Sequence, residues 1–247
     1  MTKVAALYKA APFLRCAQGA AMHLWRRPDL SQLAPTVVPV RTATQKAVAT
    51  YWAHALSPQP AHGLTRSLRA RTFLVVDARS ACLLGLIALR DPRQADADRD
   101  AAIAWSGEHR QRRLPHLLDV ARLLVPEPLR AAGVASIVAL ALLSDDVLGV
   151  VELREAATIC AVTYTSAAND ATLDGVDDVP EVTSADRRLR LFEPRANGLA
   201  FLRGCAAFDD LGPLRPFRPP ARVSGGTCDP WDAERYTLPR LLLTGDS

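Results

Sequence analysis

Residues 72–89 read TFLVVDARSACLLGLIAL, and this stretch decides the fold. Two apolar runs, at 72–77 and 81–89, are rich in Leu, Val and Ile and are joined by the short polar segment Ala78-Arg79-Ser80. Apolar runs of this length on either side of a polar turn are typical of two β-strands paired in an antiparallel hairpin. We therefore predict a β-hairpin at 72–89.

A helix is predicted before the hairpin. Thr42 and Gln45 have the spacing of a capping box, in which each side chain bonds the backbone N–H of the other residue. The apolar residues that follow have the spacing of one buried helical face, and they are Val48, Tyr51, Trp52 and Leu56. Pro58 and Pro60 end this helix.

The elements after the hairpin alternate between strands and a helix. Residues 114–125 are predicted as a mostly buried strand, broken by Pro126-Glu127-Pro128. A small-residue-rich helix is expected at 133–143, and a β-branched central strand at 158–165. Two short strands are expected further on, at 189–193 and 198–203.

The order helix, hairpin, strand, Pro-containing turn, helix, strand resembles the acyl-CoA N-acetyltransferase fold. We therefore predict an α/β (α+β) protein with an acetyltransferase-like central mixed sheet flanked by helices. Three regions are expected. They are an N-terminal helical extension and linker at 1–35, a core α/β domain at 36–205, and an irregular C-terminal tail at 206–247.

Composition sets the class of protein. Hydrophobic residues make up 49% of the 247 residues and charged residues 23%, with a net charge of +4, which is typical of a globular domain. No 18-residue apolar span without charges occurs, so no membrane partner is expected. Five cysteines without a CxxC pair favour reduced thiols in a bacterial cytoplasm, and no metal site is expected.

One short motif points to a cofactor. In the acetyltransferase fold, the turn after the fourth strand carries Arg/Gln-x-x-Gly-x-Gly/Ala, whose backbone amides hold a pyrophosphate at a helix N-terminus. Arg130, Gly133 and Ala135 fit this spacing. The resemblance implies that they bind acyl-CoA. The alternative is that Gly133 and Ala135 only allow the helix to pack closely on the sheet.

A second resemblance covers residues 36–170. The segments 74–92, 99–106 and 163–167 are similar to the Druantia anti-phage defence protein A family, in which a Leu-Leu-Gly-Leu-Ile hairpin precedes an Arg-Asp pair and an Ile-Gly-Trp motif. Here the last motif is Ile103-Ala104-Trp105, so the middle glycine is replaced. The resemblance implies an antiviral role in bacteria, with other defence-system proteins as partners.

Arg99 and Asp100 are the candidate catalytic residues. On an extended segment, neighbouring residues point to opposite sides, so Arg99 could bind a phosphate or carboxylate while Asp100 orients it or acts as a base. The alternative is that the pair fixes its loop against the core, next to Trp105. Trp105 is either a packed aromatic or a platform on which a nucleic-acid base stacks.

Arginine clusters suggest contact with DNA. Arg112 and Arg113, together with Arg110, would neutralise backbone phosphates if the clusters met on one face; solvated helix faces are the alternative. The sequence thus predicts a component of a Druantia-type defence system that contacts nucleic acid. Two alternatives are an acyl-CoA-dependent N-acyltransferase-like enzyme and a catalytically silent scaffold. Whether the chain is an enzyme stays open.

Overall fold

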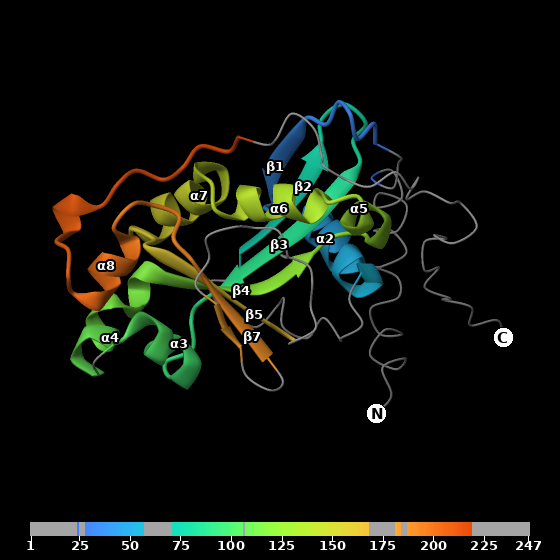
Figure 1. Cartoon of the computed structure of the whole chain (residues 1–247). Coiled ribbons are helices and arrows are strands. Elements are labelled where there is room, and N and C mark those ends of the chain that lie inside the picture. Colours follow the sequence, from blue (N-terminus) through green and yellow to red (C-terminus); the bar gives the residue numbers. More distant parts are fainter. Residues whose placement is uncertain are drawn as a thin grey trace.

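A computed structural model describes residues 24, 28–56, 71–105, 107–167, 181–183 and 187–218. Within them a mixed sheet has the strand order β1-β2-β3-β4-β5-β7-β6 (Figure 1). Its strands are β1 (Pro35–Pro39), β2 (Arg71–Asp77), β3 (Leu83–Arg90), β4 (Leu117–Leu124), β5 (Ala161–Ala167), β6 (Glu181–Thr183) and β7 (Arg187–Phe192). The helices are α2 (Ala43–Leu56), α3 (Ala97–Ile103), α4 (Gly107–Arg113), α5 (Glu127–Ala131), α6 (Val134–Leu142), α7 (Asp145–Glu155) and α8 (Gly198–Arg203), with short 3-10 turns at Leu114–His116 and Phe208–Asp210.

The predicted mixed sheet flanked by helices is confirmed. Strands β1 to β4 are antiparallel neighbours, β4 and β5 form a parallel pair, and β7 is antiparallel to both β5 and β6. Pro35 and Pro39 lie at the two ends of the edge strand β1, where their missing N–H groups cost the sheet little.

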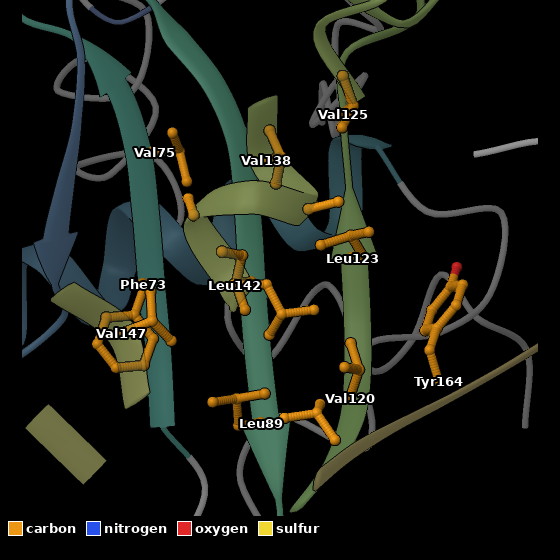
Figure 2. Close-up of a cluster of buried hydrophobic side chains, with 14 of the residues drawn as sticks. Phe73, Val75, Leu89, Val120, Leu123, Val125, Val138, Leu142, Val147 and Tyr164 are labelled. Atoms are coloured by element: carbon orange, nitrogen blue, oxygen red, sulfur yellow. The ribbon is translucent and has the colours of Figure 1, made fainter. Parts of the chain in front are cut away.

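The predicted hairpin is β2 and β3, and its second strand is apolar at nearly every position because helices cover both faces of the sheet. Leu84, Ile87 and Leu89 belong to the cluster under α6 and α7, whereas Leu86 and Ala88 belong to the cluster under α2. Figure 2 shows the first cluster, in which side chains of α6 meet those of β2, β3 and β4. Burial on both faces is what makes such a run continuous rather than alternating.

Helix α2 begins where the capping box predicts. The Thr42 N–H donates to Gln45 Oε1 at 3.0 Å, and the Gln45 N–H donates to Thr42 Oγ1 at 3.2 Å. Tyr51 and Trp52 lie on the predicted buried face and are fully buried. The reciprocal bonds satisfy backbone donors that the first helical turn leaves without partners.

Two expectations were wrong. Residues 198–203 form helix α8 rather than a strand. A short apolar run such as this one does not distinguish the helical spacing of apolar residues from the strand spacing. Arg99 and Asp100 lie in helix α3 rather than on an extended segment, because Asp96 caps that helix and accepts the Arg99 N–H at 3.2 Å. The predicted N-terminal helix lies outside the described residues apart from residue 24, as does the tail beyond 218.

Candidate functional site

Strands β4 and β5 separate part of the way along their length. They pair in parallel over four rungs, from Leu117 with Ala161 to Val120 with Tyr164. Beyond these rungs β4 continues beside β3, while β5 continues beside β7. Figure 1 shows the two strands leaving each other as the arms of a V. We call this divergence of β4 and β5 the strand split.

A bulge in β4 coincides with the start of the strand split. Ala88 of β3 faces Arg122, but the next residue, Leu89, faces Val120, so Ala121 is an extra residue in β4. A bulge bends its strand and increases the local twist, which turns β4 away from β5. Within the described residues, the facing edges of Ala121–Leu124 and of β5 beyond Tyr164 have no strand between them.

A carboxyl group lies on the third paired rung. Asp119 of β4 is opposite Thr163 of β5, whose hydroxyl donates to Asp119 Oδ1, and Arg90 Nε of β3 lies 3.8 Å from Asp119 Oδ2. Burial raises the pKa of Asp119 above its ordinary value, against the opposing effects of the Thr163 hydrogen bond and the charges of Arg90 and Arg99. A buried carboxyl group with a raised pKa is a candidate acid or base.

The sequence prediction missed Asp119 and Thr163. The visible sign was an aspartate inside the apolar run LLDVARLL at 117–124. Its partner is 44 residues further along the chain, and only the register of β4 and β5 brings the two together.

The predicted pyrophosphate-binding residues follow the carboxyl end of β4. Gly133 precedes α6 with φ of 80°, a left-handed conformation that glycine adopts without strain, and α6 has no side-chain cap on its N-terminus. Arg130 is exposed and forms an ion pair with Glu127. Ala135 is buried in the core under α6, which agrees with the packing alternative for that residue.

Arg99, Asp100 and Trp105 form one buried cluster at the other end of β4. Nε and Nη2 of Arg99 donate to Asp100 Oδ1 at 2.9 and 2.6 Å, and Nη1 donates to the Arg93 carbonyl at 2.6 Å. The guanidinium carbon lies 5.5 Å from the Trp105 ring centroid, and Trp105 Nε1 donates to the Leu202 carbonyl at 2.5 Å. These contacts connect α3 to α8. They agree with the alternative in which Arg99, Asp100 and Trp105 fix this segment against the core.

The arginines of α4 are engaged in different contacts. Arg113 stacks on Phe201, with its guanidinium carbon 4.7 Å from the ring centroid. Arg110 Nη1 donates to Asp100 Oδ2 at 3.1 Å, and the exposed Arg112 forms an ion pair with Glu108 at 3.2 Å. Figure 1 places α3 and α4 at one end of the sheet and α5 at the other, so the predicted site residues form two separate groups.

The raised pKa of Asp119 predicts a pH-dependent stability. Between its unfolded and folded pKa values, the folded state keeps a proton that the unfolded state has lost, so the free energy of unfolding falls as the pH rises through this window. In Asp119→Asn this fall should be absent, so the stability of the variant relative to wild type should increase with pH and then level off. Urea denaturation of both proteins at pH values from about 3.5 to about 8 measures this difference in the free energy of unfolding.

The matched variant is Thr163→Val, which removes a hydrogen bond that lowers the pKa of Asp119. In this variant the fall in stability should extend to higher pH than in wild type. Wild-type and Asp119→Asn curves that run parallel across the whole range would contradict the prediction.

Comparison with known proteins gives a likeness in structure but none in sequence. The sequence matches no protein-family model and no curated protein. Among solved structures, the chain is similar to FeeM, an N-acyl amino acid synthase from uncultured soil microbes, with 14% identity and a TM-score of 0.39 over 66% of this chain and 92% of that one. At this level the likeness carries no argument about function.

Proposed function

We propose that the chain binds an acyl-CoA in the strand split and uses it as the donor for acyl transfer to an amine. The observation that supports this most is the four-rung pairing of β4 and β5, followed by two diverging strand edges. Backbone N–H and C=O groups on such edges need hydrogen-bond partners. The pantetheine arm of CoA is extended and contains two amide groups. In the proposed complex these amides form hydrogen bonds with the strand edges, as the backbone of an added strand does.

The two ends of the strand split suit the two ends of this donor. The uncapped N-terminus of α6 at Gly133 follows the carboxyl end of β4, and helix N-termini favour phosphate groups. Arg130, which is ion-paired with Glu127, lies in the same segment. Asp119, on the paired side of the strand split, is the acid or base next to the reacting end.

The proposed reaction needs one proton acceptor. The amine nitrogen forms the new bond to the thioester carbonyl carbon, the carbon–sulfur bond breaks, and the sulfur leaves as the CoA thiol. Asp119 in its ionised form takes the proton that the amine loses, and its raised pKa lets it pass this proton on to the leaving sulfur. Cys160 does not serve as a nucleophile at neutral pH, because burial raises its thiol pKa to about 12.

The test measures binding of acetyl-CoA and octanoyl-CoA to the full chain by isothermal titration calorimetry. Thr165 is exposed and follows the last paired rung of β5, so Thr165→Trp should obstruct the strand split and weaken binding at least about tenfold, or about 1.4 kcal/mol. Thr36→Trp, an exposed threonine on the edge strand β1, is the matched control and should bind as wild type does. Absence of binding up to millimolar donor would overturn the proposal.

The variant Asp119→Asn distinguishes two hypotheses: that the chain is an enzyme, and that it is a catalytically silent scaffold that binds the donor. If Asp119 is the base, the variant should keep donor binding and lose acyl transfer to a panel of amines. Equal binding and equal transfer rates in the two proteins would remove Asp119 from the mechanism.

The Druantia-type role stays a prediction. Its Arg-Asp and Ile-x-Trp motifs coincide with the buried cluster of α3, and Ala104, where that family has glycine, has φ of 59° at the end of this helix. Contact with DNA has less support, because Arg110 and Arg112 each form an ion pair and Arg113 stacks on Phe201. Replacing all three arginines and measuring the salt dependence of DNA retention tests it.

A further inference from the structure

The hydroxyl group of Thr163 in β5 lies between two hydrogen-bond acceptors of β4. Its Oγ1 atom donates to Asp119 Oδ1, and it also lies 3.2 Å from the Leu118 carbonyl oxygen, in a geometry that suits a second hydrogen bond. A hydroxyl group has one hydrogen and two lone pairs, so it can donate to only one of these oxygens at a time. Two acceptors therefore share one hydrogen.

The heavy atoms of this hydroxyl group are held in place. Thr163 is 2% exposed, and its strand is paired with β4 on one side and with β7 on the other. The branched Cβ atom of threonine restricts rotation of the side chain in such a setting. Both acceptors belong to consecutive residues of β4, so rotation of the hydroxyl hydrogen alone exchanges one hydrogen bond for the other.

Three charged groups act on Asp119 from the elements packed around it, namely Arg90 of β3 and the pair Asp96 and Arg99 of α3. Arg90 Nε lies 3.8 Å from Asp119 Oδ2, which is too long for a hydrogen bond. Arg99 donates to other acceptors, and Asp96 caps its helix. Within the part of the chain that the structure describes, Thr163 is therefore the hydrogen-bond donor to the Asp119 carboxyl group.

We propose that Thr163 is a positioning residue whose hydroxyl group exchanges its acceptor when Asp119 gains a proton. While Asp119 is ionised, Thr163 donates to Oδ1. The positive charge of Arg90 beside Oδ2 favours Oδ1 as the oxygen that takes the proton. The protonated Oδ1 then donates to Thr163 Oγ1, and the hydroxyl hydrogen turns to the Leu118 carbonyl oxygen. A hydrogen bond therefore holds the carboxyl group in either protonation state.

The role of this exchange in catalysis rests on the proposed acyl transfer. The amine nitrogen loses one proton as it forms its bond to the thioester carbon, and Asp119 gains that proton. Thr163 keeps its own hydrogen and only changes the direction in which that hydrogen points. A carboxyl group that is held in one geometry in both states needs no rearrangement during the proton transfer. Thr163 thus acts through Asp119 rather than on the substrates.

Nuclear magnetic resonance of the full chain without donor tests the exchange. The backbone carbonyl carbon of Leu118 is observed through the amide of Asp119, and its signal moves downfield when its oxygen accepts a hydrogen bond. As the pH falls through the pKa of Asp119, this signal should move downfield in wild type, and Asp119→Asn should abolish the movement. Movement of equal size in wild type and Thr163→Val would overturn the proposal.

Three variants of Thr163 separate the effect of the hydroxyl group from an effect on the fold. Thr163→Val and Thr163→Ala lack the hydroxyl group, so the Leu118 signal should keep only the smaller movement that the charge of Asp119 causes directly. Thr163→Ser keeps the hydroxyl group and should restore the wild-type movement. Thr36→Val, which removes the hydroxyl group of an exposed threonine on the edge strand β1, is the matched control and should titrate as wild type does.

These results are independent of the acyl-donor proposal. A larger movement in wild type than in Thr163→Val, in a protein that binds no acyl-CoA, would support the hydrogen-bond exchange and overturn the proposed function. Binding of acyl-CoA with equal movements in the two proteins would do the reverse. Where both proposals hold, Thr163→Val should shift the pH dependence of kcat to higher pH with the KM for the donor unchanged, and Thr163→Ser should reverse the shift.

Discussion

Replacing Arg99 by alanine should lower the free energy of unfolding by about 3–5 kcal/mol. The Arg99 side chain is 2% exposed, and its guanidinium group contacts Asp100, the Arg93 carbonyl and the Trp105 ring. Among the described residues, removing it leaves Arg110 as the cationic partner of Asp100, and it leaves a cavity beneath α3. Urea denaturation followed by circular dichroism measures the loss.

Arg112→Ala is the matched control for Arg99→Ala. Arg112 and its partner Glu108 are 76% and 71% exposed, so solvent screens the pair and the change should cost less than about 1 kcal/mol. An Arg99→Ala protein as stable as the Arg112→Ala protein would contradict the structural role of Arg99 and would return it to the candidate catalytic residues.

Gly85→Ala should cost about 1–3 kcal/mol, because it forces an extra methyl group into a filled interface. A Cβ atom at Gly85 of β3 would lie 2.7 Å from Val138 Cγ2 of α6 and 3.0 Å from the Leu124 carbonyl oxygen of β4. The glycine therefore sets how closely α6 approaches the sheet. Displacement of α6 would also move Gly133 at its N-terminus, so acyl-CoA affinity should fall together with stability.

The variant Gly85→Ala/Val138→Ala tests this cause directly. Removing the two methyl groups of Val138 makes room for the new one, so the double variant should be less destabilised than the sum of the two single variants. Gly107→Ala is the neutral control, because nothing lies within 4 Å of a Cβ atom at Gly107. Strict additivity in the double variant would show that contact with Val138 is not the cause.

The elements that could be predicted from the sequence are those with a local cause. The hairpin follows from two apolar runs around a polar turn, and α2 follows from the side chains of Thr42 and Gln45. The strand at 114–125, the helix at 133–143 and the strand at 158–165 correspond to β4, α6 and β5. In each of these cases a pattern within a few residues was strong enough to decide the outcome.

The candidate site could be predicted only in part, because its main parts depend on strand pairing. Gly133 was found through a spacing motif, but the strand split follows from the register of β4 against β5 and from the bulge at Ala121. Arg99 and Asp100 were expected on an extended segment but lie in helix α3, because the capping role of Asp96 was not recognised among the charged residues around it. The predicted directions of the Arg99 and Asp100 side chains were therefore wrong as well.

The short parallel pairing of β4 with β5 has a consequence for the order in which the protein folds. The β2–β3 hairpin closes a short loop, in which Val76 pairs with Leu83, whereas β5 reaches β4 only after the chain has passed through α5, α6 and α7. Contacts between distant segments carry the larger loop-closure cost and form more slowly. The β2–β3 hairpin should accordingly form early, and pairing of β5 with β4 should come later.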